Sequence, residues 1–303
     1  MGSIAFSKYQ GLGNDFLVVD NRSTPSTPSC EKLVDGVFVI ARDLCDRRYG
    51  VGGDGVLSLT RPTSEGAIAT MRVLNADGSE AEMCGNGLRC VAKFLAETGD
   101  GQPESVLVDT LAGALDCQLE WLDGAVAAVT VNMGRPRLRP TEIPMAGETS
   151  LDSYIEQPLA LAAGTRATTA VSMGNPHAIA FVPESGPALE ALATTQGAEV
   201  ETHASFPSRT NAEFAHVVDP THIELWVWER GCGITQACGT GACATAVAAC
   251  LTGRAELETE IEVRLPGGPL AITVASDYAT VFMRGPAVHV FDGTAQLRAL
   301  TDS

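Results

Sequence analysis

Two cysteines, Cys84 and Cys238, each precede a glycine-rich turn and a run of small and apolar residues that is typical of a buried helix. Backbone N–H groups in the first turn of a helix are unpaired and carry the positive end of the helix dipole. Such a position binds anions and lowers the pKa of a cysteine thiol. The spacing therefore predicts a reactive thiol at the start of each helix.

The other cysteines lie outside these two motifs. A free cysteine usually packs as a small hydrophobic residue. The absence of a Cys-x-x-Cys pair argues against a disulfide framework or a zinc ribbon. We expect structural roles for Cys30, Cys45, Cys90, Cys117, Cys232, Cys243 and Cys250, and no metal site.

The two cysteine motifs belong to a longer internal repeat. Cys, Gly, Gly, Ala, Thr and Gly recur at identical offsets from Cys84 and from Cys238. A Thr-Val-x-Met-x-x-Pro pattern starts at Thr130 and again at Thr280. Because these landmarks return in the same order, the sequence predicts a duplication with one such cysteine in each half.

Two thiols related by a pseudo-twofold axis suit a reaction in which both act on one carbon. One thiolate removes a proton from one face and the opposite thiol returns a proton to the other, which inverts the centre. The N–H groups of the two helix starts would stabilise the substrate carboxylate as negative charge develops. The pair Cys84 and Cys238 therefore predicts a racemase or epimerase that uses no cofactor.

Other chemistries remain open at this point. A Cys–His hydrolase could use His177, which lies in a Gly-Asn-Pro-His motif, but it leaves the second matched cysteine unexplained. A dithiol redox protein or a phosphate-binding protein is less well supported, because this chain has neither a Cys-x-x-Cys pair nor a P-loop signature. Pyridoxal phosphate would need a lysine, and Lys8, Lys32 and Lys93 lie in no convincing cofactor site. A silent amino-acid-binding protein is a further alternative.

The composition narrows the class of partner. The chain has 303 residues and a net charge of −17, and such a surface repels nucleic acid and anionic membranes. No targeting segment or long apolar run is evident, so we expect a cytoplasmic protein. A small-molecule substrate fits best, and the sequence leaves room for a homodimer.

Each half alternates short strands with turns around one enclosed helix, so the expected class is α+β with two pseudo-symmetric domains. The predicted domains are 1–135 and 136–286. Residues 31–47 have helical spacing, whereas residues 137–169 are rich in Pro, Gly, Ala and Thr and are expected to form irregular connecting structure.

Six motifs together resemble the diaminopimelate epimerase family over essentially the whole length of the chain. They are residues 11–16 (GLGNDF), 75–80 (NADGSE), 83–90 (MCGNGLRC), 174–177 (GNPH), 229–231 (ERG) and 237–242 (ACGTGA). The resemblance implies conversion of LL-2,6-diaminopimelate to the meso form in lysine biosynthesis, without pyridoxal phosphate. It also implies that each domain is a β-barrel-like sheet wrapped around its central helix, with residues 287–303 returning to complete the first domain.

The same resemblance assigns roles to individual residues. It makes Cys84 and Cys238 the acid/base pair, and it suggests that His177 and Glu229 tune the pKa of the thiols or of the substrate amine. The implied substrate-binding residues are Asn14, Asn75, Gly85, Asn86, Asn175, Asn211, Glu229, Arg230, Gly239 and Thr240. A carboxylate and a guanidinium suit the distal ammonium and carboxylate of diaminopimelate. A proline or hydroxyproline racemase, the alternative within this architecture, would need neither.

The chain departs from the family pattern at Gly55. Many members have a glutamine after the Gly-x-Gly-x-Asp turn, and this chain has glycine after Asp54. A side-chain contact to the substrate is therefore either missing here or made by Asp54 or the backbone.

Overall fold

A computed structural model describes residues 3–23, 33–34, 37–81, 83–147 and 151–296 of the chain. The chain forms two compact units, Met1–Val131 with Gly285–Ser303, and Asn132–Arg284. Among the described residues, no helix has the length and apolar character needed to cross a bilayer.

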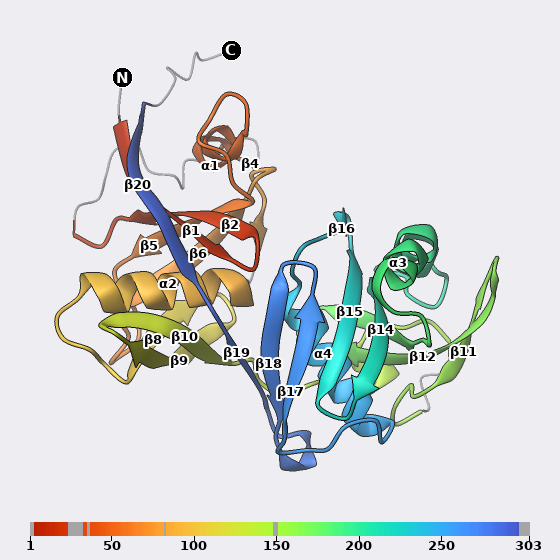
Figure 1. The fold of residues 1–303 in the computed structure, drawn as a ribbon. Helices are drawn as coiled ribbons and strands as arrows, with labels where there is room; N and C mark the ends of the chain where they lie inside the picture. The colour runs from red at the N-terminus through yellow and green to blue at the C-terminus, as the bar shows by residue number, and fades with distance from the viewer. Residues whose placement is uncertain (1–2, 24–32, 35–36, 82, 148–150, 297–303) are drawn as a thin grey trace. The chain divides into compact units, whose positions relative to one another are not determined.

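The first unit is a mixed sheet around helix α2 (Gly85–Thr98). Its strands are β1 (Ser3–Gly11), β2 (Asn14–Asp20), β5 (Gly55–Thr60), β6 (Ala69–Asn75), β7 (Glu80–Ala81), β8 (Ser105–Thr110), β9 (Gly113–Leu122), β10 (Ala125–Asn132) and β20 (Val288–Gln296). β20, β1 and β2 are antiparallel, β2 is parallel to β5, and β5 is antiparallel to β6. β6 then pairs with the short β7 and, in parallel, with β8, which leads to antiparallel β9 and β10. Figure 1 shows β20 beside β1, although the two come from opposite ends of the chain.

The second unit repeats this arrangement around helix α4 (Gly239–Leu251). Its strands are β11 (Gln157–Leu161), β12 (Gly164–Ser172), β13 (Pro176–Phe181), β14 (Asn211–Asp219), β15 (His222–Glu229), β16 (Gly233–Ile234), β17 (Glu260–Leu265), β18 (Gly268–Val274) and β19 (Val281–Gly285). β11 to β13 are antiparallel, β13 is parallel to β14, and β14 is antiparallel to β15. β15 pairs with the short β16 and, in parallel, with β17, followed by antiparallel β18 and β19.

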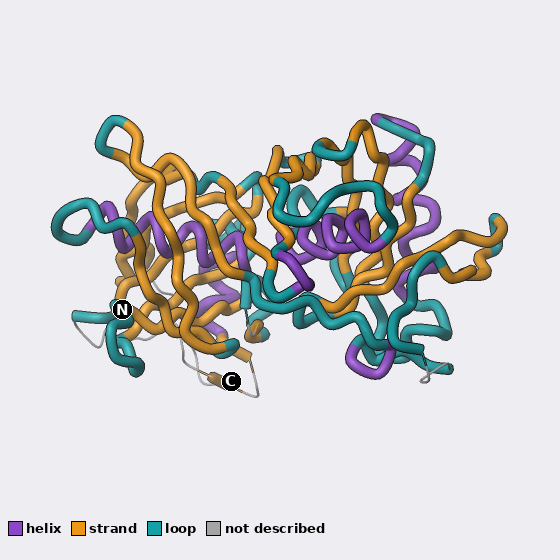
Figure 2. Tube along the Cα trace, turned by 90° about the horizontal axis from the view of Figure 1, so that it is seen from below, coloured by secondary structure: helices purple, strands orange, loops and turns teal. Residues whose placement is uncertain are grey.

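The two series of pairings match strand for strand, with β20 in the place of β11. Both α2 and α4 lie among strands of their own unit (Figure 2), and most of their residues are buried. Small residues let the strands approach α4, which is apolar on nearly all sides. The structure confirms the predicted α+β class with two pseudo-symmetric domains.

Two local expectations were wrong or incomplete, and one helix was not anticipated. Helix α1 (Val39–Cys45) is shorter than predicted, because β3 (Leu33–Val34) and β4 (Val37–Phe38) pair in antiparallel fashion before it. Residues 31–32 and 35–36 of the predicted helix lie outside the described residues. Residues 137–169 are not wholly irregular: they hold η1 (Pro140–Glu142), β11 and most of β12. Helix α3 (Gly186–Glu201) was not expected, and its weak segregation of apolar from polar residues explains why. The remaining short helix is η2 (Ser276–Tyr278).

Candidate active site

Cys84 and Cys238 are the N-cap residues of α2 and α4, as the sequence predicts. Both have extended backbone, and each sulfur accepts a hydrogen bond from the backbone N–H three residues later in the chain. The distance from Cys84 Sγ to Gly87 N is 3.4 Å, and that from Cys238 Sγ to Gly241 N is also 3.4 Å. Gly85 and Gly239 are the first residues of the two helices. The thiols thus sit beside the unpaired N–H groups that an anionic group prefers.

A second contact repeats at the two helix starts. Asn86 Nδ2 donates to Asn14 Oδ1 at 3.2 Å, and Asn175 Nδ2 donates to Thr240 Oγ1 at 3.3 Å. In each case the polar residue two positions after the cysteine meets an asparagine that follows a glycine turn. The structure therefore brings these four candidate binding residues to the helix starts of their own units.

Asp54 fixes the position of Asn14 in the first unit. One oxygen of its carboxylate accepts from Asn14 Nδ2 at 2.7 Å and from the N–H of Asp15 at 3.0 Å. Its other oxygen accepts from Arg47 Nη2 at 2.8 Å, and Arg47 also pairs with Asp15 at 2.5 Å. The Asp54 carboxylate is therefore committed to protein donors.

Gly55 lies where even a Cβ atom would crowd the neighbouring backbone. It pairs with Asn75 across β5 and β6, and a Cβ on Gly55 would lie 2.8 Å from the backbone oxygen of Leu74. The Asn75 side chain donates to Ser79 Oγ at 2.9 Å within the following turn. The expected family glutamine therefore has no side-chain counterpart at Gly55.

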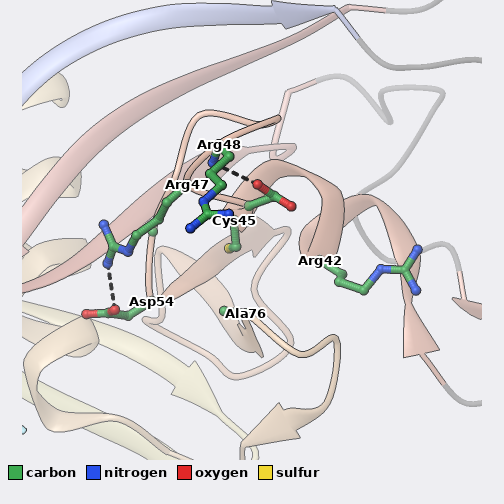
Figure 3. Close-up of a pocket in the computed structure, with 8 residues that line it drawn as sticks. Arg42, Cys45, Arg47, Arg48, Asp54 and Ala76 are labelled. Carbon is green, nitrogen blue, oxygen red and sulfur yellow. Dashed lines mark hydrogen bonds and ion pairs between the residues drawn. The ribbon is translucent and has the colours of Figure 1, made fainter.

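A hollow of about 470 Å³ adjoins these residues in the first unit (Figure 3). Arg47 reaches toward Asp54, whereas Arg42 points away from it. The residues that line the hollow are Arg42, Cys45, Asp46, Arg47, Arg48, Gly53, Asp54 and Ala76. It borders the candidate binding site through Asp54, which holds Asn14.

Asn211 organises the residues after β15 in the second unit. Its Oδ1 accepts from the N–H of Arg230 at 2.9 Å, and its Nδ2 donates to the backbone oxygen of Pro176 at 2.9 Å. Glu229 Oε1 accepts from Thr235 Oγ1 at 2.5 Å. These contacts tie the predicted Glu-Arg pair to the start of β13.

The family model for diaminopimelate epimerase matches residues 6–139 and 169–290. The chain belongs to the diaminopimelate epimerase family. It is 48% identical over 294 residues to a diaminopimelate epimerase of Synechococcus sp. (strain JA-2-3B'a(2-13)), which covers 96% of this chain and 98% of the relative. The corresponding protein of Synechocystis sp. (strain ATCC 27184 / PCC 6803 / Kazusa) is 45% identical over 296 residues, 97% of this chain and 100% of the relative. The chain is therefore an isomerase, an epimerase.

Solved structures share the fold at much lower sequence identity. A hydroxyproline epimerase from Agrobacterium vitis superposes with a TM-score of 0.69 at 15% identity, over 99% of this chain and 93% of the other. A phenazine biosynthesis protein from Bacillus anthracis gives a TM-score of 0.68 at 16% identity, over 98% of this chain and 100% of the other. These likenesses concern the fold alone.

Glu213 is a residue of this epimerase that the sequence analysis did not identify. Its Oε1 lies 2.6 Å from His177 Nδ1, and both side chains are fully buried. His177 Nε2 lies 3.0 Å from Asn175 Oδ1, so His177 reaches the Cys238 helix start through Asn175. The available signal was a glutamate between Ala212 and Phe214 in β14, since a charged residue is buried only with a partner.

The expected lowering of a thiol pKa is wrong for Cys238 in this structure. Burial raises the pKa of Cys238 well above its usual value, and the negative charge of Glu229 raises it further, as Glu213 would if its buried carboxyl were ionised. Hydrogen bonds from Thr240 and the Gly241 N–H oppose this rise. The helix start that would stabilise a thiolate is thus present, but the loss of solvation on burial has the larger effect on the pKa of Cys238.

Proposed function

We propose that this epimerase interconverts LL- and meso-2,6-diaminopimelate in lysine biosynthesis, with Cys84 and Cys238 as the acid and base and without a cofactor. The main support is the matched geometry of the two sulfurs, each of which lies 3.4 Å from the third backbone nitrogen of its helix. In each direction of the reaction, one thiolate accepts the α-proton and the other thiol donates its own proton. The two cysteines then exchange protonation states, and exchange with solvent or the reverse reaction restores them.

The substrate carboxylate is bound by the helix starts in this proposal. Residues Gly85, Asn86, Gly239 and Thr240 would supply the donors, because N–H groups of the first helical turn are aimed at an anion there. These donors stabilise the negative charge that develops as the α-proton leaves.

The distal end of diaminopimelate carries an ammonium and a carboxylate. Glu229 offers an anion and Arg230 a guanidinium, which match these groups in charge. Asn14, Asn75, Asn175 and Asn211 supply amides that can donate or accept. His177 and Glu229 tune the thiols, and for Glu229 the support is the rise that its charge causes in the pKa of Cys238.

The lysines support a reaction without pyridoxal phosphate. Lys8 Nζ pairs with Asp15 at 2.5 Å, and Lys93 Nζ pairs with Glu97 at 2.8 Å and also donates to the backbone oxygen of Val126 at 2.6 Å. Lys32 lies outside the described residues. Both amines are thus engaged by oxygen atoms of their own unit. The homodimer, the domain boundaries 1–135 and 136–286 with 287–303, and the cytoplasmic location stay predictions.

Turnover in deuterated water tests this mechanism. Product should carry solvent deuterium at the inverted carbon, and retention of the substrate's own proton there would overturn the two-base assignment. Cys84→Ala and Cys238→Ala should each lower kcat by at least ~10³-fold, since each removes one proton-transfer group. Proline and hydroxyproline, assayed beside diaminopimelate, should not be turned over; preference for either would redirect the substrate assignment.

A further inference from the structure

The two units differ at one pair of equivalent positions beneath their helix starts. A Cβ on Gly87 would meet Leu57 Cδ2 at 2.9 Å. A Cβ on Gly241, the equivalent glycine, would meet Glu213 Oε1 at 3.1 Å and Cys238 Sγ at 3.2 Å. A carboxyl group therefore lies close to Cys238, where the other unit has a leucine.

The strand registers support this equivalence. Phe16 pairs with Gly55 across parallel β2 and β5, and His177 pairs with Asn211 across parallel β13 and β14. Leu57 and Glu213 lie two residues after Gly55 and Asn211. The polar pair His177–Glu213 thus corresponds to the apolar pair Phe16–Leu57.

Glu213 and His177 must share a proton. Their facing atoms are 2.6 Å apart, and neither side chain has any exposed surface. Glu213 Oε2 makes no hydrogen bond of ordinary geometry among the residues that the structure describes, although the Ala178 N–H lies near the carboxyl and acts to lower its pKa. A charged carboxylate so poorly compensated would be costly. Burial also raises the pKa of Glu213. The favoured arrangement is therefore a protonated Glu213 that donates to Nδ1 of a neutral His177.

This arrangement sets the direction of every later hydrogen bond. With Nδ1 accepting, His177 carries its hydrogen on Nε2 and donates to Asn175 Oδ1 at 3.0 Å. Asn175 Nδ2 donates to Thr240 Oγ1 at 3.3 Å. Because that oxygen accepts from Asn175, the Thr240 hydroxyl hydrogen is free to point at Cys238 Sγ, 3.6 Å away.

We propose that Glu213 is a positioning residue for Cys238: as a protonated acid, it orients a chain of hydrogen bonds that ends with a donor at the sulfur. The proposal rests on the acid/base role given to Cys238 above. A donor at the sulfur favours the thiolate and offsets the burial and the Glu229 charge that disfavour it. The Gly241 N–H acts in the same sense.

The two thiols are unequal in this arrangement. The side chains equivalent to His177 and Glu213 near Cys84 are Phe16 and Leu57, which carry no hydrogen-bonding atoms. Cys84 is half-buried, whereas Cys238 is buried. The hydrogen-bond chain therefore serves the thiol that burial makes harder to ionise.

The pH dependence of Cys238 alkylation by iodoacetamide, followed on the Cys238 peptide by mass spectrometry, tests the sign of the effect. Glu213→Gln keeps a donor to His177 and should shift the midpoint by less than about 0.3 pH unit. Glu213→Leu, which takes the residue found at position 57, should raise it by about one unit, a tenfold lower thiolate fraction at fixed pH. If Glu213 is charged, both variants remove a repulsive charge and the midpoint falls, which overturns the proposal.

The same titration in a Thr240→Val background tests the route. Since the chain acts on Cys238 through Thr240, the effect of Glu213→Leu should disappear when the last donor is gone. Thr240→Ser should restore it. A Glu213→Leu shift that persists in Thr240→Val would show a general structural effect and overturn the proposal.

Nitrogen-15 NMR of histidine-labelled protein measures the tautomer of His177 in the wild type itself. The His177 signals, assigned by their loss in His177→Gln, should show a protonated Nε2 and an unprotonated Nδ1. Protonation at both nitrogens, or at Nδ1 alone, would refute the proposed direction. Neither NMR nor alkylation depends on turnover, so failure here is distinct from failure of the epimerase mechanism, which deuterium incorporation decides.

Discussion

The Asp54 carboxylate accepts a 2.7 Å hydrogen bond from the Asn14 side chain, and Asn14 in turn accepts from Asn86 at the Cys84 helix start. An acidic residue that the sequence presents only as part of a glycine-rich turn thus holds a candidate substrate-binding amide. Arg47 holds the Asp54 carboxylate in turn, with Nη2 2.8 Å from Oδ1. Asp54 therefore acts on the site through Asn14.

Asp54→Ala should raise KM for diaminopimelate by about 10- to 100-fold, because a charge-assisted hydrogen bond that orients Asn14 is lost. The fall in kcat should be smaller, since Asp54 does not touch the reacting carbon in this assignment. Steady-state kinetics measure both values. Arg42→Ala is the control: Arg42 lines the same hollow but points away from Asp54, so its KM should stay unchanged (Figure 3). An unaltered KM in Asp54→Ala would contradict this role.

Adding a methyl group at the two equivalent glycines should have different consequences. In Gly241→Ala the new Cβ would lie about 3.1–3.2 Å from Glu213 Oε1 and Cys238 Sγ, both held by buried contacts. We expect kcat to fall by roughly 10- to 100-fold, since a small displacement of a reacting group is costly.

Gly87→Ala meets the movable end of Leu57 instead. It should cost about 1–3 kcal/mol of stability by overpacking, with a smaller loss in kcat than at Gly241. Measurements of kcat and Tm on both variants test the contrast. Equal losses of kcat would show that the sulfur contact at Gly241 has no special importance.

Buried thiols should make the fold sensitive to alkali. Burial raises the pKa of Cys90 and of Cys117 from 9.0 to about 12. The unfolded chain therefore releases these protons first. The stabilisation is complete below pH 9 and is lost as pH rises toward 12, by about 1.4 kcal/mol per pH unit for each thiol.

Urea unfolding at several pH values between 8 and 11 measures this loss. Cys117→Val should reduce the slope by the share of one thiol, and Cys90→Ala should do the same. A slope identical to that of the wild type in both variants would mean that other groups cause the alkaline loss.

Glu229→Gln should change two measurements in opposite senses. Removing the Glu229 charge should lower the pKa of Cys238, so iodoacetamide should react with Cys238 at lower pH. KM for diaminopimelate should nevertheless rise by about tenfold or more, because the substrate ammonium loses its anionic partner. An unchanged alkylation profile would show that Glu229 does not influence the pKa of Cys238. An unchanged KM would show that Glu229 does not bind the substrate.

The sequence by itself determined the duplication, the fold class and the family. Each rests on local information: glycines and a cysteine at fixed offsets define a helix start, and the same offsets return in the second half. The N-cap positions of Cys84 and Cys238 follow from such spacing, because capping is a property of neighbouring residues. The resemblance likewise gave the epimerase class through short, contiguous motifs.

Only the tertiary structure decided the surroundings of the thiols. Glu213 lies far along the chain from His177 and close to it in space, because parallel pairing of β13 and β14 sets their separation. The pKa of Cys238 depends on burial and on acidic residues from β14 and β15, and no local pattern encodes that sum. Short motifs fix which groups are present; packing fixes their desolvation and their partners, and these set the acidity on which the chemistry depends.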